Sequence, residues 1–269
     1  MQGTFSKHIK LSMPLLRTDE VIVLDIKEIG ESDLMISFLT RHSGKLKGIA
    51  KHAKKSIRRF PNCFSLGNLL SLEYSIRPNK DLSFLLQGRL IKSPMYEIHE
   101  LKLDSNIKLG IYTLKLTDIA LPLSLPEPNI YEMLLKLFTK LKEQRNAKSL
   151  CLYYETRLMK LLGYGINLTE CLSCKRRYTF TGKAFFAPLK GGIYCQRCAP
   201  STGTFTLEPA QIAILNSYQT TDIEDMLITD LDPIAFERLS SVIVSHMKQH
   251  ISPIPTYVWG IREKISKGS

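Results

Sequence analysis

Apolar residues between positions 19 and 92 recur with the two-residue period of β-strands. Leu70, Leu72, Tyr74 and Ile76 alternate with polar residues, as in a strand that buries one face and exposes the other to water. Runs of this kind predict five short strands, at residues 21–26, 34–39, 46–50, 69–76 and 84–91. The sequence Pro-Asn-Lys-Asp at 78–81 predicts the turn between the last two.

After Ser93-Pro94 the apolar period changes to that of helices. Residues 252–269 show no such period, and we expect them to form a loosely ordered end. The first thirteen residues lack the apolar core of a signal peptide and are expected to be an extension or a tag outside the fold. Apolar faces at helical spacing predict five helices, at residues 107–121, 128–141, 150–162, 209–218 and 233–250.

These elements predict an α+β protein. Five strands over residues 14–93 suit a small closed barrel, and among such barrels the five-stranded OB-fold recurs on nucleic acids. An SH3-like barrel is the alternative. Residues 94–269 would form an α-helical domain that is interrupted by a cysteine-rich insertion at residues 168–200.

Net charge narrows the classes of partner. The chain has 37 Lys and Arg against 25 Asp and Glu, a formal net charge of +12, which favours nucleic acid or another anionic surface. No run of 18 uncharged apolar residues offers a membrane span. Six cysteines, four of them in CxxC pairs, fit a reducing compartment better than a secreted disulfide framework. We therefore expect a cytoplasmic protein.

The positive charge is concentrated in residues 41–59, which we call the basic segment. It holds eight Lys and Arg and no Asp or Glu. Apolar residues on both sides predict a β-hairpin whose turn is His42-Ser43-Gly44, with Gly44 supplying a positive φ. Its basic side chains would then crowd one exposed ribbon. The alternatives are a polyanion-binding surface and a solubilising face, and a one-signed cluster on an ordered element favours the first.

The most specific motif is a pair of CxxC sequences separated by twenty residues, Cys171 to Cys174 and Cys195 to Cys198. Two such knuckles can place four thiolates around one zinc ion. No His, Asp or Glu lies between them, so a closed four-sulfur site would be structural. An iron site and free thiols are the alternatives. The cations around the motif would offset its negative charge or extend the anion-binding surface; they are Lys175, Arg176, Arg177 and Arg197.

Catalytic motifs are missing from the sequence. It contains neither GxxxxGK[ST] nor HExxH. His246 and His250 are spaced for a shared metal ion, but no third ligand lies near them in sequence. Glu28, Glu31 and Asp33 could hold magnesium only if they converged in space, and we interpret them as turn residues that balance the basic segment. We therefore expect no enzymatic activity.

Short motifs occur in a fixed order along the chain. They are Leu15-Leu16-Arg17-Thr18, Gly30-Glu31-Ser32-Asp33, Thr40, Ser43-Gly44-Lys45, Gly48-Ile49-Ala50-Lys51, Ala53-Lys54-Lys55, Pro61-Asn62-Cys63-Phe64, Leu72-Glu73-Tyr74 and Gly191-Gly192 before the last two cysteines. Together with the cysteine pairs, this order resembles the RecO family of bacterial DNA repair and recombination mediators. The resemblance runs from Pro14 to about Pro253. His52 departs from the pattern, which often has a small residue or Gly there.

The resemblance implies an OB-fold, a helical domain and a zinc-bearing insertion, and a role without catalysis. It implies binding of single- and double-stranded DNA, annealing of complementary strands, contact with the C-terminal tail of SSB, and work with RecR to place RecA on DNA. We expect a nucleoid-associated protein. Phe60 would be either a base-stacking aromatic or a core residue at a barrel corner. The other DNA-binding residues would be Arg41, Lys45, Lys47, Lys51, Lys54, Lys55, Arg58 and Arg59.

Two other functions remain open. An RNA-binding OB protein would prefer RNA to DNA of the same sequence through 2′-hydroxyl contacts. A zinc-containing nuclease or hydrolase would cleave DNA with the help of Glu31 or Asp33.

Overall fold

The computed structural model describes residues 15–76, 82–143, 146–226, 230–251 and 253–267. The expected extension at residues 1–13 and the expected turn at 78–81 lie outside these ranges. The chain divides into two compact units: a barrel unit of residues 1–93 and 122–126, and a helical unit of residues 94–121 and 127–269. The short return of residues 122–126 to the barrel unit was not expected from the sequence.

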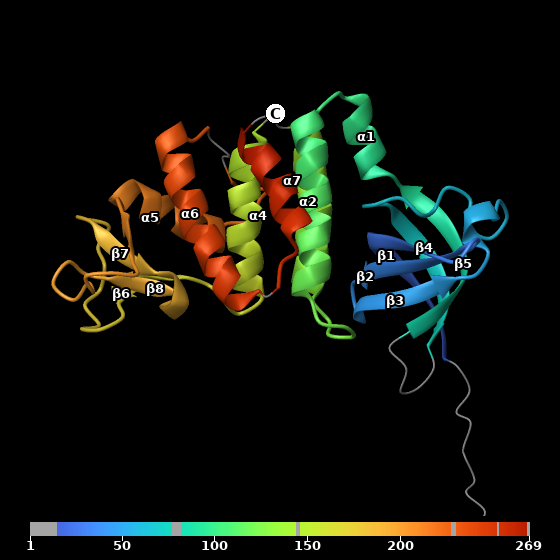
Figure 1. Cartoon of the computed structure of the whole chain (residues 1–269), viewed down its shortest axis with the longest axis horizontal. Helices are drawn as coiled ribbons and strands as arrows, with labels where there is room; N and C mark the ends of the chain where they lie inside the picture. The colour runs from blue at the N-terminus through green and yellow to red at the C-terminus, as the bar shows by residue number, and fades with distance from the viewer. Residues whose placement is uncertain (1–14, 77–81, 144–145, 227–229, 252, 268–269) are drawn as a thin grey trace, which may run out of the picture. The chain divides into compact units, whose positions relative to one another are not determined.

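The barrel unit is a closed five-stranded barrel of the OB type, with strand order β1-β2-β3-β5-β4 (Figure 1). All neighbours are antiparallel except β3 and β5, which pair in parallel. The five predicted strands are confirmed. The observed strands are β1 (Leu15–Ile29), β2 (Asp33–Thr40), β3 (Gly44–Ala50), β4 (Leu69–Ile76) and β5 (Leu82–Lys92).

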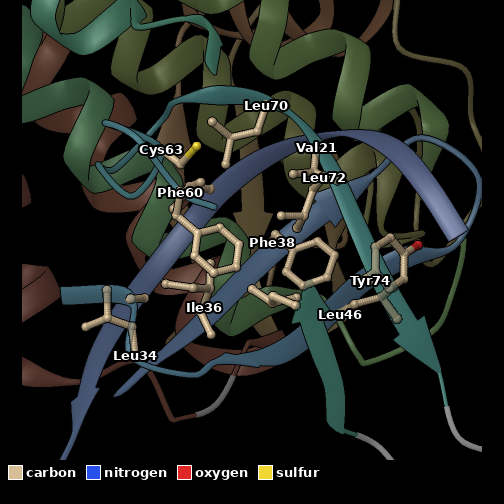
Figure 2. Close-up of a cluster of buried hydrophobic side chains, with 14 residues drawn as sticks. Val21, Leu34, Ile36, Phe38, Leu46, Phe60, Cys63, Leu70, Leu72 and Tyr74 are labelled. Atoms are coloured by element: carbon tan, nitrogen blue, oxygen red, sulfur yellow. The ribbon is translucent and has the colours of Figure 1, made fainter. Parts of the chain in front are cut away.

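Strand β1 starts six residues before the predicted strand at 21–26. Its first residues are largely exposed, so the hydrophobic pattern does not include them, yet they continue the ladder with β4 from Leu15 opposite Ile76 onward. Backbone hydrogen bonding therefore extends the strand beyond its buried part. The barrel core includes Phe38 and Tyr74, whose rings meet edge-on at 5.4 Å (Figure 2).

The described part of the helical unit contains seven α-helices, most of which are labelled in Figure 1. The sequence predicted five of them and missed α1 and α7. The expectation of a loosely ordered end was wrong, because α7 buries Val258 and Ile265 and pairs Arg262 with Glu155. The helices are α1 (Pro94–Glu100), α2 (Asp104–Ala120), α3 (Pro128–Glu143), α4 (Ala147–Leu161), α5 (Pro209–Thr220), α6 (Pro233–His250) and α7 (Thr256–Lys267).

A small sheet interrupts the helices between α4 and α5, and we call residues 167–207 the cysteine module. Its strand order is β6-β8-β7-β9, and the sequence analysis missed it because strands of three to five residues are too short to show a period. The strands are β6 (Asn167–Cys171), β7 (Ala184–Ala187), β8 (Gly192–Tyr194) and β9 (Phe205–Leu207). None of the described helices is long and apolar enough to cross a membrane.

Candidate functional site

The basic segment begins in the β2–β3 turn. Residues 41–43 form the turn, and Gly44 opens β3 with a φ of +72°. This positive φ was predicted. A Cβ atom at this position would also collide with the backbone of Leu125, which belongs to the same unit. Glycine is thus required for both backbone conformation and space.

The basic segment does not continue as one hairpin ribbon. Strand β3 ends at Ala50, and the chain then turns into a short 3₁₀ helix, η1 (Ala53–Lys55), and a loop that leads to β4. His52 makes this turn with a φ of +53°. A left-handed conformation suits Gly best, because a Cβ atom raises its energy, so His52 holds a backbone conformation that Gly would adopt more easily.

Asp33 holds this turn in place. Its carboxylate accepts the backbone N–H of His52 at 2.8 Å and the Lys51 ammonium at 2.8 Å. These two contacts lower the pKa of Asp33, the His52 backbone N–H contributing most. The side chain of His52 lies 3.1 Å from the Ser32 hydroxyl. The first turn of the barrel therefore positions the second half of the basic segment.

Two candidate DNA-binding residues are buried. Lys45 is 6% exposed and Phe60 is 4% exposed. Phe60 belongs to the barrel core, and Figure 2 shows its ring pointing toward Ile36. It also lies 4.9 Å from the Phe64 ring. This burial favours the core alternative for Phe60, because a ring enclosed by core residues offers no face to a base.

The loop that carries Phe60 closes one end of the barrel. The backbone N–H of Gly88 donates to Arg59 O at 2.8 Å, and a Cβ at Gly88 would lie 3.1 Å from Cys63 Sγ. Cys63 is fully buried, and burial raises the pKa of its thiol to about 11. A thiol in that state is not a nucleophile at neutral pH.

Six basic residues of the segment are exposed, and they differ in how far neighbouring carboxylates neutralise them. Lys51 pairs with Asp33, and Lys54 pairs with Glu28 at 2.6 Å. Among the described residues, Lys55 and Arg58 make no ion pair. Lys47 is half-buried on β3. The exposed residues are Arg41, Lys51, Lys54, Lys55, Arg58 and Arg59.

A concave surface of about 570 Å³ lies beside two of these cations, Lys54 and Lys55. Lys54, Lys55 and Ile57 line it, together with Asn62 and Phe64. Ile57 is 85% exposed, and the sequence analysis did not single it out. The sequence signal for an exposed Ile57 was its position between charged residues, outside any predicted strand. The surface offers both positive charge and an apolar contact.

The four cysteines of the CxxC pairs come together in the cysteine module. Their sulfur atoms all lie within 4.8 Å of one another, close enough to hold one metal ion. Cys171 ends β6, and Cys195 follows β8, which pairs with β6 in parallel. The Cys195 backbone N–H donates to Cys171 Sγ at 3.4 Å. All four are thiols rather than disulfides.

The backbone favours thiolates at this cluster. Burial opposes ionisation of Cys171, but the backbone N–H groups of Cys195, Cys174 and Ser173 outweigh it and lower its pKa to about 6. The pKa of Cys198 is instead raised to about 11, because its thiol hydrogen-bonds to Cys195 and Cys174. A cation bound by crowded sulfurs would displace the protons that remain on them. The donor set therefore fits a metal ion of the zinc type.

No second metal cluster occurs in the described ranges: the four cysteines are the one group of three or more His, Cys, Asp or Glu that could hold an ion there. Glu28 and Asp33 instead pair with lysines, as expected of charge balance. His246 is buried, and its two ring nitrogens lie within hydrogen-bond distance of backbone carbonyl oxygens: Nδ1 to Pro188 O and Nε2 to Tyr164 O.

The chain is a two-unit protein in which an OB-type barrel is followed by a helical unit that carries a four-cysteine module. Sequence comparison gives the family. The family described as recombination protein O, N-terminal, matches residues 13–94, and the one described as recombination protein O, C-terminal, matches residues 106–256. The chain belongs to the RecO family of DNA repair proteins.

Several relatives of similar length are named DNA repair protein RecO. The DNA repair protein RecO of Syntrophus aciditrophicus is 28% identical over 74% of this chain and 75% of its own. That of Bacillus pumilus is 26% identical over 85% of this chain and 87% of its own. That of Syntrophobacter fumaroxidans is 30% identical over 65% of this chain and 68% of its own. The RecO resemblance noted from short motifs is therefore confirmed.

Proposed function

We propose that this protein binds single- and double-stranded DNA through the exposed part of its basic segment and anneals complementary strands without catalysing a reaction. The observation that carries the proposal is the group of exposed cations in this segment. Lys54 and Lys55 line an open concave surface, and Lys55 and Arg58 make no ion pair among the described residues. Cations of this kind displace counterions from the phosphate backbone, which lowers the repulsion between two strands.

Family membership supports the wider role. In that role the protein contacts RecR and the C-terminal tail of SSB and helps to place RecA on SSB-coated DNA. The protein works in the cytoplasm, at the nucleoid.

The four cysteines hold one structural zinc ion that keeps the cysteine module folded. The closed set of four sulfur donors supports a structural rather than a catalytic site, because a tetrahedral ion with four protein ligands has no open position for water or substrate.

The experiment is annealing of two labelled complementary oligonucleotides across a salt series, followed by gel analysis of the strands. We expect accelerated annealing that weakens steeply with salt, with both strands intact. Shortened strands would identify an enzyme instead. Preference for RNA over DNA of the same sequence would identify an RNA-binding protein.

A charge-reversal pair tests the residues. The variant K55E/R58E removes two cations that make no ion pair in the described structure, and it should lose annealing while the melting temperature stays unchanged. The matched control is R89E/K92E, which reverses two exposed cations on β5 and changes the net charge equally. Equal loss in both variants would mean that net charge, and not the basic segment, drives binding.

A further inference from the structure

The cysteine module carries a second concave basic surface, in a different unit from the basic segment. We call it the module cleft. It has a volume of about 310 Å³ and is open to solvent. The side chains that matter most in its lining are Arg176, Arg177, Arg197, Tyr178 and Tyr194.

Most of the uncompensated charge in the module gathers at this cleft, with Lys190 exposed outside it. Between Cys171 and Cys198 there are six Lys and Arg and no Asp or Glu. Lys175 pairs with Glu170 at 3.2 Å, and Lys183 pairs with Glu208 at 3.1 Å. By contrast, the three cleft arginines are exposed and make no ion pair within the described part of the chain. A group of unpaired guanidinium groups on one cleft fits phosphate groups.

The turns that gather the sulfurs also position the arginines. The Cys171 backbone N–H donates to Arg176 O at 2.9 Å, which fixes the chain after the first knuckle. Arg197 lies inside the second knuckle, where the Cys198 N–H donates to Cys195 O at 3.0 Å. Cations held on a rigid backbone lose less conformational entropy on binding than cations on a mobile arm.

Aromatic side chains line the same cleft. The Tyr178 hydroxyl donates to Gly182 O at 2.7 Å, which anchors its ring. The Phe180 ring lies edge-on to it at 5.4 Å and is 42% exposed. Rings beside a positively charged groove are the combination that single-stranded nucleic acid recognises, since unpaired bases stack on the rings while the backbone follows the charge.

Hydrogen bonding within the cysteine cluster leaves the arginine side chains available. Cys171 Sγ accepts the backbone N–H of Cys195, and the three guanidinium groups are exposed. Exposed guanidinium groups on one cleft can bind an anionic ligand from outside the chain.

We propose that the module cleft is a second binding site for single-stranded DNA, with phosphates held by Arg176, Arg177 and Arg197 and a base stacked on Tyr178 or Tyr194. The protein then holds one strand at the basic segment and another at the module. That consequence for annealing rests on the proposed function, whereas strand binding at the cleft stands on the cleft's own residues.

The test uses the full-length, metal-loaded protein and an oligo(dT) strand that contains 5-iodouracil. We expect ultraviolet light to cross-link it to peptides that contain Tyr178 or Tyr194. The variant R176Q/R177Q/R197Q should lose these cross-links. The slope of log K against log salt should also become less steep by about 2, because each phosphate contact contributes about 0.7 to its magnitude on single strands. The control K160Q/K190Q/K264Q removes the same charge at exposed lysines outside the cleft.

The outcomes separate the two proposals. A parent protein that neither binds nor anneals DNA would defeat the proposed function. A parent that anneals DNA but gives no cross-link in the module, or a cleft variant with the salt slope of the control, would defeat the second site alone. Metal content is measured for each variant, so that loss of the module's fold is recognised. If a labelled oligo-glutamate probe binds to the cleft and no DNA cross-link forms there, the cleft is a peptide site and the proposal is overturned.

Discussion

Arg262 of α7 and Glu155 of α4 form a buried ion pair with two contacts, Nε to Oε1 at 2.5 Å and Nη2 to Oε2 at 2.8 Å. Glu155 is completely buried. It also accepts the Tyr112 hydroxyl of α2 at 2.6 Å, while Arg262 Nη1 donates to Ser240 of α6 at 2.9 Å. One pair of charges thus connects four helices, and α7 is part of the core.

Replacement of Arg262 by Met should destabilise the helical unit by about 3–5 kcal/mol, because it leaves the Glu155 carboxylate buried without a partner. Denaturant unfolding followed by far-ultraviolet circular dichroism measures this. The control is R262M/E155L, which removes both charges and should recover much of the loss. If R262M unfolds like the parent, α7 is not held by this pair.

Asp33 should make the order of the basic segment depend on pH. Its pKa is lowered in the folded protein, so the stabilisation is present above the ordinary value of 3.8 and is lost as the pH falls through the lowered value. Hydrogen exchange at the His52 amide measures it, because this N–H donates to the carboxylate. We expect faster exchange in D33N at neutral pH than in the parent.

The matched control for this prediction is E31Q. It removes a nearby negative charge and leaves the contacts of Asp33 with His52 and Lys51 in place. It should leave the His52 exchange rate unchanged. Equal exchange in D33N and the parent would show that the turn holds its shape without the carboxylate.

Replacement of Phe60 by Ala should cost about 3–5 kcal/mol of barrel stability, since it removes a core ring and leaves a cavity. Replacement by Leu keeps most of the volume and should cost less than about 1.5 kcal/mol. We expect F60L to bind DNA as tightly as the parent when binding is measured by fluorescence anisotropy. Normal stability with weak binding in F60L would restore the base-stacking role.

The sequence predicts those parts of the fold whose periodicity comes from burial. Strands such as 69–76 and helices such as 128–141 bury one face, and their bounds follow closely. Helix α7 was missed because its fixed position depends on Arg262, a charged residue whose partner is 107 positions away. Patterns of polarity do not report such a pair.

The candidate sites divide in the same way, into features that the sequence predicts and features that depend on the folded structure. Cysteine spacing alone brings four sulfurs together, since local turns form each knuckle. Basic residues cannot be ranked from their order along the chain. Lys45 is buried on β3, while Lys55, ten positions later, is exposed beside the concave surface. The module cleft combines residues from both knuckles, and only the folded sheet places Arg177 and Arg197 on one surface.

The double substitution C171S/C198S should abolish metal binding and unfold the cysteine module while the barrel stays intact. Two of four thiolate ligands are lost, and hydroxyl oxygen is a poor ligand for zinc. Hydrogen exchange over residues 167–207, together with metal analysis of the purified protein, measures both effects. The control C63S changes a buried thiol outside the cluster and should keep the metal.

Acid should release the same metal from the parent protein. Zinc needs thiolates, and protons compete for them as the pH falls. Backbone N–H groups lower the pKa of Cys171, and a bound cation lowers it further, so we expect release at acid pH. A chromogenic chelator added across a pH series follows it. Metal that stays bound to C171S/C198S, or a module whose exchange is unchanged after metal loss, would contradict a structural ion at this site.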